Sequence, residues 1–300
     1  MGPEQRQLYG CKIAYIRIFK QAYFSILHSL ATINLPRELG RHGALIVNKL
    51  FDLTGKVAVV TASTRGMGLA IARALGASGA KLVISGRSQE SADAAAARLR
   101  DEGGFEVAAF ACDITDPESV KRFAADALAA FGHIDALVLN AAGDPPAGSL
   151  LGQKPEQFDK TMTEGVRGSL ALVLALAPQM VERKYGSIVF MSSRAAKRGT
   201  GVLGLYGMAK AAIDQLVRNL ALELGPSNIN VNSINPGAVR TDFSRMLWEN
   251  PEREKMTVST IPMGRIAEPE DVAGLALLLV SGAGHYINGQ NISVDGGGTA

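Results

Sequence analysis

Short apolar runs alternate with longer segments of helical periodicity along most of the chain. The apolar runs that predict strands are residues 56–61, 81–85, 106–111, 136–140, 187–192, 230–235 and 291–294. The segments between them that predict helices are residues 68–78, 90–102, 117–131, 155–184, 206–224 and 268–281. Because strand–helix alternation is typical of parallel βαβ units, the pattern predicts an α/β fold, a doubly wound three-layer sandwich with one seven-stranded parallel sheet. Ligands of such folds bind at the carboxyl ends of the strands.

This pattern covers residues 51–300, which we expect to form a single domain, and residues 1–50 form a separate extension. The extension holds seven Lys and Arg against two Glu, whereas the rest of the chain holds 24 basic against 26 acidic residues. Its apolar residues fall near helical spacing, which predicts a basic amphipathic helix. Its longest uncharged stretch, residues 21–36, is too short and too polar for a membrane span, so no integral span is expected.

Three interpretations of the extension stay open. It has the acid-poor, amphipathic character of an organelle-targeting leader. It could equally make peripheral contact with a membrane or a partner through residues 1–35. In the third interpretation translation begins near Val47 and the extension is not part of the working protein. A cytoplasmic location is expected unless the first interpretation holds.

Composition and charge exclude several classes of protein. The chain is 47% hydrophobic and 20% charged, which is ordinary for a globular protein. The near-neutral charge of residues 51–300 argues against a nucleic-acid partner. Cys11 and Cys112 are far apart, which excludes a disulfide framework and fits a reducing compartment. Neither the cysteines nor the four scattered histidines have metal-ligand spacing, so no metal is expected.

A glycine-containing turn follows the first predicted strand and opens the first helix. It reads Thr61-Ala-Ser-Thr-Arg-Gly-Met-Gly68. Glycines at such a turn let backbone N–H groups approach a pyrophosphate at the positive end of the helix dipole. A tight turn without a ligand is the alternative interpretation.

This turn resembles the TGxxxGxG loop of the classical short-chain dehydrogenase/reductase (SDR) family, and the likeness extends over residues 52–298. Ala62 replaces the first glycine of that loop, and we expect a relaxed turn in which it needs no positive φ. The resemblance implies a Rossmann-type domain and a dinucleotide cofactor. The residues it assigns to the cofactor are Ala62, Ser63, Thr64, Arg65, Gly66, Met67, Gly68, Arg87, Asp113, Ile114, Asn140, Ala141, Tyr206, Lys210, Pro236, Gly237, Val239 and Thr241.

The end of the second strand favours NADP(H) over NAD(H). By the resemblance, NAD-binding members carry an acidic residue at the position of Gly86, where it accepts from the ribose hydroxyls. Here that carboxylate is missing, and Arg87 follows immediately. Arg65 supplies a second basic group on the same side, and guanidinium groups suit a 2′-phosphate. The alternative is that both arginines are solvated surface charges.

Tyr206 and Lys210 lie one helical turn apart, and Ser193 lies thirteen residues before Tyr206. Free tyrosine and lysine have pKa values of about 10 and about 10.4, so neither exchanges protons well at neutral pH. A nearby ammonium and an oxidised nicotinamide would pull the pKa of Tyr206 toward the working range. The resemblance implies that Tyr206 exchanges a proton with a carbonyl or alcohol oxygen, that Ser193 holds this oxygen, and that Lys210 also binds ribose.

Gly165 departs from the family pattern. The family has an asparagine at this position, and its main-chain carbonyl holds a water in a proton relay to the lysine. Glycine keeps the carbonyl but weakens a helix by about 1 kcal/mol.

Two segments bear on the substrate. Residues 242–262 lie where the family has a mobile lid, and Met246, Leu247 and Trp248 supply apolar surface there for a substrate or for packing. Arg194, Lys197 and Arg198 follow the catalytic serine, and we hypothesise that they attract an anionic group, a solvated face being the alternative.

The sequence therefore predicts an NADP(H)-dependent oxidoreductase that interconverts a carbonyl and an alcohol in a small molecule, similar to 3-oxoacyl-carrier-protein reductases or carbonyl reductases. A dienoyl- or enoyl-CoA reductase is one alternative, because Asn140-Ala-Ala-Gly143 and the missing asparagine resemble that group. A nucleotide-binding scaffold or sensor without turnover is the other. The resemblance also implies a homotetramer assembled through the Tyr206 helix and the C-terminal segment.

Overall fold

The computed structural model describes residues 49–141, 143 and 145–300. The predicted amphipathic helix of the extension therefore lies outside the described residues.

Seven parallel strands form one sheet, as predicted. They are β1 Val57–Val60, β2 Lys81–Gly86, β3 Val107–Ala111, β4 Ala136–Leu139, β5 Gly186–Met191, β6 Ile229–Pro236 and β7 Asn291–Val294. Their order across the sheet is β3-β2-β1-β4-β5-β6-β7, and every neighbouring pair is parallel. All residues of β1, β4, β5 and β6 are buried. β1, β4 and β5 accordingly read as apolar or mostly apolar runs, whereas β6 also buries Asn230, Asn232 and Asn235.

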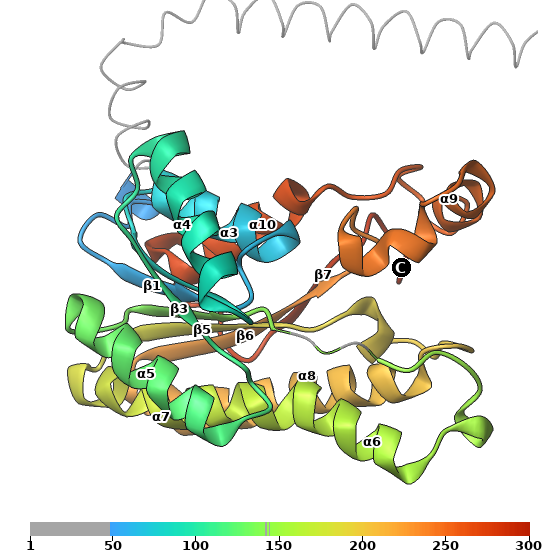
Figure 1. Ribbon diagram of the computed structural model, residues 1–300, viewed down its shortest axis with the longest axis horizontal. Helices are drawn as coiled ribbons and strands as arrows, with labels where there is room; N and C mark the ends of the chain where they lie inside the picture. Colours follow the sequence, from blue (N-terminus) through green and yellow to red (C-terminus); the bar gives the residue numbers. More distant parts are fainter. Residues whose placement is uncertain (1–48, 142, 144) are drawn as a thin grey trace, which may run out of the picture. The chain divides into compact units, whose positions relative to one another are not determined.

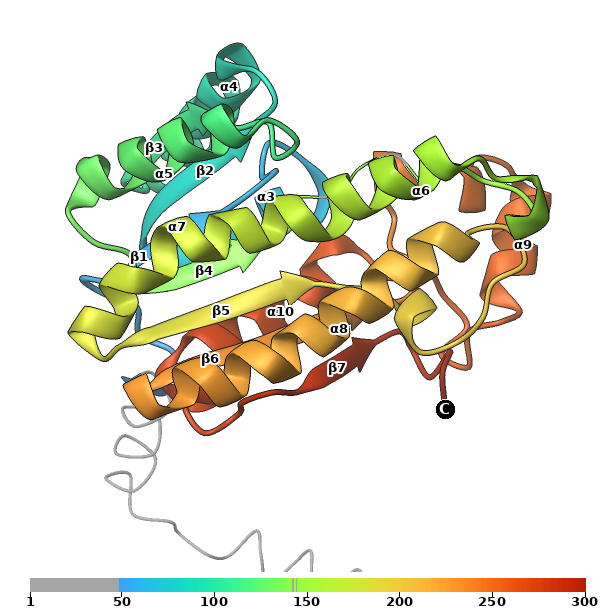
Figure 2. The same ribbon diagram turned by 90° about the horizontal axis from the view of Figure 1, so that it is seen from below.

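Helices cover both faces of the sheet and complete the predicted three layers (Figure 1). Helices α3 (Gly66–Ala77), α4 (Gln89–Gly103) and α10 (Pro269–Val280) lie on one face. Helices α5 (Pro117–Phe131), α7 (Gly168–Arg183) and α8 (Gly204–Leu224) lie on the other, and Figure 2 shows them in front of the strands. Each helical layer buries its apolar face against one face of the sheet, which gives two large hydrophobic clusters.

The helix predicted over residues 155–184 is present without a break, but it contains a π-helical turn that was not predicted. The chain forms α6 (Pro155–Met162), the π-helical turn (Thr163–Arg167) and then α7. Gly165 lies in the middle of the π-helical turn, where low helix propensity makes the wider turn less costly. The short helix α9 (Pro251–Val258), inside the segment 242–262, was not predicted because it buries no residue and so has no apolar face to detect.

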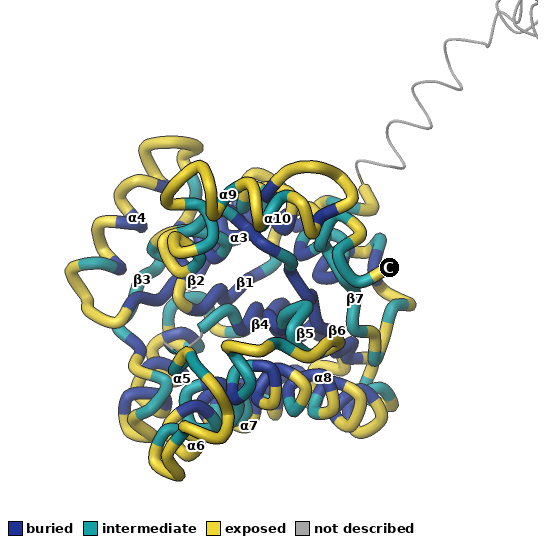
Figure 3. The backbone as a smooth tube through the Cα atoms, turned by 90° about the vertical axis from the view of Figure 1, so that its right-hand side faces the viewer, coloured by how far each residue is buried: buried dark blue, intermediate teal, exposed yellow. Residues whose placement is uncertain are grey.

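The strand order reverses between β1 and β4, so the chain leaves these neighbouring strands in opposite directions. A doubly wound sheet binds its ligand at such a point, outside the carboxyl ends of the strands. Figure 3 looks onto this edge, with the buried sheet between the two helical layers. Within the described part of the chain, no helix has the length and apolar character needed to cross a membrane.

Candidate active site

The turn after β1 is built around two residues with positive φ. Ala62 has φ +49° and Gly66 has φ +55°. The expectation that Ala62 avoids a positive φ is therefore wrong. The conformation is held in place because the Ala62 N–H donates to Ser85 Oγ at 3.0 Å and its carbonyl accepts from Asn140 Nδ2 at 3.0 Å. Hydrogen bonds on both sides thus stabilise a turn that glycine would form without strain.

Asn140 and Thr61 connect the turn after β1 to the end of β4. The Thr61 hydroxyl accepts from the N–H groups of Asn140 and Ala141 at 3.0 and 3.2 Å. A Cβ at Gly68 would lie 2.6 Å from Asn140 Nδ2, so only glycine fits there. Thr61 was missed as a site residue because it reads as the last residue of a strand.

Some of the predicted cofactor residues direct their side chains into the protein and not toward the carboxyl ends of the strands. Ser63 is fully buried, and its hydroxyl donates to the Val60 carbonyl at 2.6 Å, so it serves the turn itself. Met67 packs against the core on the α3 side, and Ile114 against the core on the other face. Val239 is buried and bridges to Ala267.

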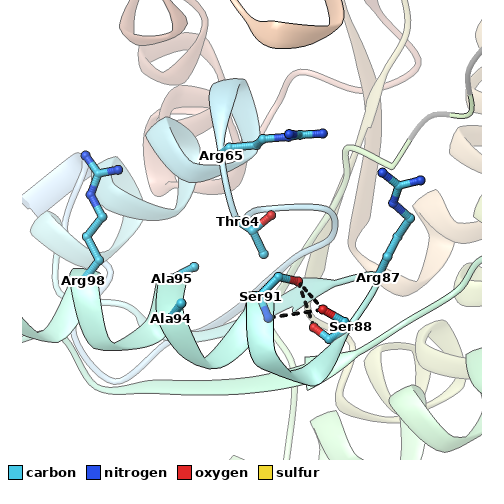
Figure 4. Close-up of a pocket in the computed structure, with 8 residues that line it drawn as sticks. All are labelled: Thr64, Arg65, Arg87, Ser88, Ser91, Ala94, Ala95 and Arg98. Carbon is cyan, nitrogen blue, oxygen red and sulfur yellow. Dashed lines mark hydrogen bonds between the residues drawn. The ribbon is translucent and has the colours of Figure 1, made fainter.

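An open cleft of about 540 Å³ lies between the turn after β1 and the start of α4. Its lining residues are Thr64, Arg65, Arg87, Ser88, Ser91, Ala94, Ala95 and Arg98 (Figure 4). Three of them are arginines and none is acidic, so the cleft is positively charged. Figure 4 shows Arg65 and Arg87 at one end of the cleft and Arg98 at the other.

The side chains of Ser91 and Thr64 occupy the space beside Gly86 at the end of β2. A Cβ there would lie 2.5 Å from Ser91 Oγ and 2.8 Å from Thr64 Cγ2. An acidic residue at this position would therefore require these two side chains to move. Nearby, Arg87 contributes to lowering the pKa of Asp113, after the two hydrogen bonds from Thr115.

Thr241 closes the site from the carboxyl end of β6. Its Cγ2 would lie 3.2 Å from a Cβ at Gly66, so residues far apart in sequence meet over the turn. The next residue, Asp242, forms an ion pair with Arg65 at 3.4 Å. Pro236 ends β6, and the Gly237 N–H donates to Val294 at 2.9 Å, which joins the end of β6 to β7.

Ser193, Tyr206 and Lys210 come together beyond the end of β5. Lys210 Nζ lies 5.6 Å from the centre of the Tyr206 ring and donates to the Met191 carbonyl at 2.7 Å. Burial lowers the pKa of Lys210 to about 8, against an opposing effect of Asp214.

Burial raises the pKa of Tyr206, and a hydrogen bond with Ser193 opposes this rise. We expected Lys210 to lower the pKa of Tyr206, and the protein by itself does not show this lowering. The physical reason is that loss of hydration outweighs the available positive charge, part of which is directed at the Met191 carbonyl. Tyr206 is accordingly held as a neutral phenol, which is a proton donor.

A buried carboxylate was missed behind Lys210. Asp214, one turn further along α8, is 5% exposed and accepts from Asn235 Nδ2 at 2.8 Å and from the Ser233 hydroxyl at 2.9 Å. Asn235 Nδ2 also donates to the Ser193 carbonyl at 3.1 Å. The Ser233 hydroxyl accepts from Asn291 at 2.7 Å. This network fixes the backbone of Ser193 relative to α8. The sequence did not predict it, because an aspartate within a helix is usually exposed and belongs to no motif here.

The three basic residues after Ser193 differ in their surroundings. Lys197 donates to the Asn291 carbonyl and to Ser293 at 2.7 and 3.0 Å, and Arg198 donates to the Gly298 carbonyl at 3.1 Å. Arg194 is half-buried, and its Nη1 is buried without a hydrogen-bond partner among the described residues. Burial and the nearby Arg198 lower the pKa of Arg194.

The segment 242–262 is here called the lid, and it shares a small hydrophobic cluster with residues on either side of it. Leu247 and Trp248 pack against Ala238, Ile261 and Ile266, which favours the packing interpretation for these two. Met246 is half-exposed. Phe243, which the sequence did not single out, lies with its ring centre 6.2 Å from that of Tyr206.

Within the described residues, no group of three or more His, Cys, Asp or Glu is placed to hold a metal ion. Burial raises the pKa of the Cys112 thiol to about 12, so it is neutral at physiological pH.

Comparisons with known proteins agree on one family. The family model described as enoyl-(acyl carrier protein) reductase matches residues 61–299. The chain is 42% identical over 245 residues to dehydrogenase/reductase SDR family member 4 of Bos taurus, covering 82% of this chain and 88% of that protein. It is 40% identical to human dehydrogenase/reductase SDR family member 2, mitochondrial, over 81% and 86% of the two chains. Among solved structures, 7α-hydroxysteroid dehydrogenase complexed with NADH and 7-oxo glycochenodeoxycholic acid has a TM-score of 0.79 at 32% identity, covering 83% of this chain and 96% of that one.

Proposed function

Because this chain belongs to the short-chain dehydrogenase/reductase family, in which it is an oxidoreductase with a nicotinamide cofactor, we propose that it is an NADP(H)-dependent carbonyl reductase. The observation that carries the choice of cofactor is the cleft beside Gly86. It is lined by three arginines and no carboxylate, and position 86 carries glycine beside the side chains of Ser91 and Thr64.

The residues of the chain fit a dinucleotide. The turn after β1 directs backbone N–H groups at the start of α3, where the helix dipole favours a pyrophosphate. Arg65 and Arg87 would hold the 2′-phosphate, to which guanidinium groups donate in pairs. Thr241 would lie over the nicotinamide end. When bound, the dinucleotide supplies the hydride that reduces the substrate carbonyl carbon.

The protein groups supply the proton and the charge stabilisation. Tyr206, held as a neutral phenol, donates its proton to the carbonyl oxygen as that oxygen gains negative charge. The Ser193 hydroxyl donates a hydrogen bond to the same oxygen. The Lys210 ammonium stabilises the phenolate that remains. Because Ser193, Tyr206 and Lys210 are all present and adjacent, carbonyl chemistry is favoured over enoyl reduction and over a scaffold without turnover.

We include a homo-oligomer in the proposal. Leu174 on α7 and Leu222 on α8 are 66% and 80% exposed, so these helices offer apolar surface to a second copy. Light scattering of the purified protein, compared with a Leu174→Glu/Leu222→Glu variant, measures the assembly.

The first experiment is a fluorescence titration of wild type and Arg87→Ala with NADPH and with NADH. Loss of a charged hydrogen bond is worth about 1.5–3 kcal/mol, so we expect the variant to bind NADPH roughly 10- to 100-fold more weakly and NADH as before. Equal loss for both cofactors would contradict a phosphate-binding role. A carbonyl screen with the preferred cofactor, with Tyr206→Phe as the inactive control, then tests turnover.

A further inference from the structure

Glu164 is a largely buried carboxylate beside the catalytic pair. It lies in the π-helical turn, and its side chain is 17% exposed. Its Oε2 lies against Gly143, where a Cβ would overlap it. Its ion-pair partner among the described residues is Lys160, at 3.8 Å, and no side chain or backbone group in that set donates a hydrogen bond to it. A carboxylate this buried is costly unless something compensates for its lost hydration.

The carboxylate shares a small hollow with Tyr206 and Lys210. The hollow is lined by Gly143, Pro145, Thr161, Glu164, Gly165, Tyr206, Ala209 and Lys210. Its volume is about 10 Å³, which is about the space that one water molecule needs. The lining offers the carboxylate, the phenol, the ammonium and the Thr161 hydroxyl as polar partners for that water.

Gly165 keeps this space open. A Cβ at position 165 would lie 3.2 Å from the Cβ of Ala209, and both residues line the hollow. A side chain at position 165 would therefore require Ala209 to move by a few tenths of an ångström.

Repeated turnover requires a route for protons to this point. Each carbonyl reduction transfers the hydroxyl proton of Tyr206 to the product alcohol. The phenolate must recover one proton before the next cycle, and Lys210 beside it is fully enclosed. Among the described residues that line the hollow, Glu164 is the acid, and its side chain is partly exposed; Lys160 beside it is exposed.

We propose that Glu164, acting through one water in this hollow, returns protons from solvent to the Tyr206–Lys210 pair. The protonated carboxyl gives its proton to the water. The water in turn gives one to the Tyr206 phenolate, while Lys210 stays an ammonium, and the Glu164 carboxylate regains a proton from bulk water. No electrons move in this step, and one proton is taken from solvent for each alcohol formed. The titratable groups around Glu164 in the described structure are Lys160, its ion-pair partner, and Tyr206 and Lys210, which line the same hollow.

The role of Glu164 rests on the proposed carbonyl reductase function, and the experiment distinguishes failure of the one from failure of the other. Steady-state turnover of a carbonyl found in the screen is compared with a single turnover of enzyme preloaded with reduced cofactor. Glu164→Gln keeps the side-chain size, and Glu156→Gln, an exposed carboxylate on α6, is the matched control. Glu164→Ala is measured with and without acetate, a small carboxylate that can enter the hollow's mouth.

We expect Glu164→Gln to lower steady-state kcat at least about tenfold, in line with proton-transfer groups, and to leave the single-turnover rate within about twofold of wild type. Acetate should restore part of the kcat of Glu164→Ala. Unchanged kcat in Glu164→Gln, as in Glu156→Gln, would overturn the assignment. An equal fall of both rates without rescue would reduce Glu164 to a structural role. A wild type without any cofactor-dependent turnover would instead overturn the proposed function and this assignment with it.

Discussion

Gly86 and Ser91 lie so close together that a Cβ on the glycine would come within 2.5 Å of the serine hydroxyl. A side chain at the end of β2 would therefore have to displace Ser91 in the first turn of α4, and the cleft that we propose for the ribose is lined by three arginines and no carboxylate.

Replacing Gly86 by Asp should fail to convert the protein to NADH. The added side chain overpacks the contact with Ser91 and Thr64, which costs about 1–3 kcal/mol. We expect a lower Tm and weaker binding of both cofactors, measured by thermal unfolding and nicotinamide fluorescence. Gly199→Asp, in a loop where nothing lies within 4 Å, is the control. A Gly86→Asp variant with tighter NADH binding and an unchanged Tm would show that the contact is not limiting.

Ala62 is a site where glycine should stabilise the protein. The left-handed conformation destabilises the folded state by about 1–2 kcal/mol when the residue is alanine. Glycine avoids this strain, but it increases the conformational entropy of the unfolded chain, which lowers the free energy of unfolding by about 0.4–1 kcal/mol. We therefore expect Ala62→Gly to raise the free energy of unfolding by roughly 0.5–1 kcal/mol in a denaturant titration and to keep NADPH binding. Ala97→Gly, on the exposed face of α4, should lower it by about 1 kcal/mol. A destabilised Ala62→Gly would mean that the turn does not strain the alanine.

Carbonyl reduction should lose rate above pH 8. The pKa of Lys210 is lowered from its ordinary 10.5 to about 8 by burial, so the ammonium is present below pH 8 and is lost as the pH rises through that value. Tyr206 stays protonated through this range because its pKa is raised. We expect kcat/KM to fall about tenfold per pH unit above 8, in a pH–rate profile corrected for cofactor saturation.

Asp214→Asn should move that fall to lower pH, because the negative charge of Asp214 raises the pKa of Lys210. The amide can be accommodated: its oxygen accepts from Asn235, and its NH₂ donates to the Ser233 hydroxyl, which can still donate to the Asn235 oxygen. Ser233→Ala disturbs the same network without a change of charge and is the control. A pH profile that moves equally in both variants would point to packing instead of charge.

Arg194 is the candidate contact for an anionic group of the substrate. Lys197 and Arg198 are engaged with backbone near the C-terminus, whereas Arg194 has a buried Nη1 without a partner in the described structure. We expect Arg194→Gln to raise KM roughly tenfold for a carbonyl acid and to leave KM for its methyl ester unchanged. Arg198→Gln, with its exposed side chain, is the control. Equal effects on the acid and the ester would exclude the contact, as would an acid KM that does not respond to salt.

The sequence was a good guide to the parts of this fold that are governed by periodicity. Most of the strands read as short apolar runs, and all seven were found with ends correct to within one or two residues, including β6, which carries asparagines, and β7, which is only partly buried. The π-helical turn at Gly165 was not found, because residues on both sides keep a helical pattern while the hydrogen-bond spacing changes. Helix α9 was missed because it buries nothing.

The site was predictable where a motif places residues and unpredictable where packing does. Ser193, Tyr206 and Lys210 are adjacent as their spacing indicates, and their roles stay predictions. Ser63 turns inward, and Phe243, Asp214 and Glu164 join the site from segments without a motif. The pKa of Tyr206 could not be anticipated from neighbouring residue types, because its direction depends on how much water burial removes.

In the proposed function, the ion pair between Arg65 and Asp242 links the binding of the cofactor to the start of the lid. Arg65 borders the phosphate cleft, and Asp242 is the first residue of the lid, next to the Phe243 that lies by Tyr206. A 2′-phosphate bound as proposed would take the Arg65 guanidinium and leave Asp242 paired with Arg245 at 3.0 Å, so cofactor binding would be linked to one of the two ion pairs at the start of the lid. Both side chains are about half-exposed or more, and such pairs are worth about 0–1 kcal/mol. The coupling is thus at most about fivefold, enough to favour cofactor first and substrate second without preventing the reverse order.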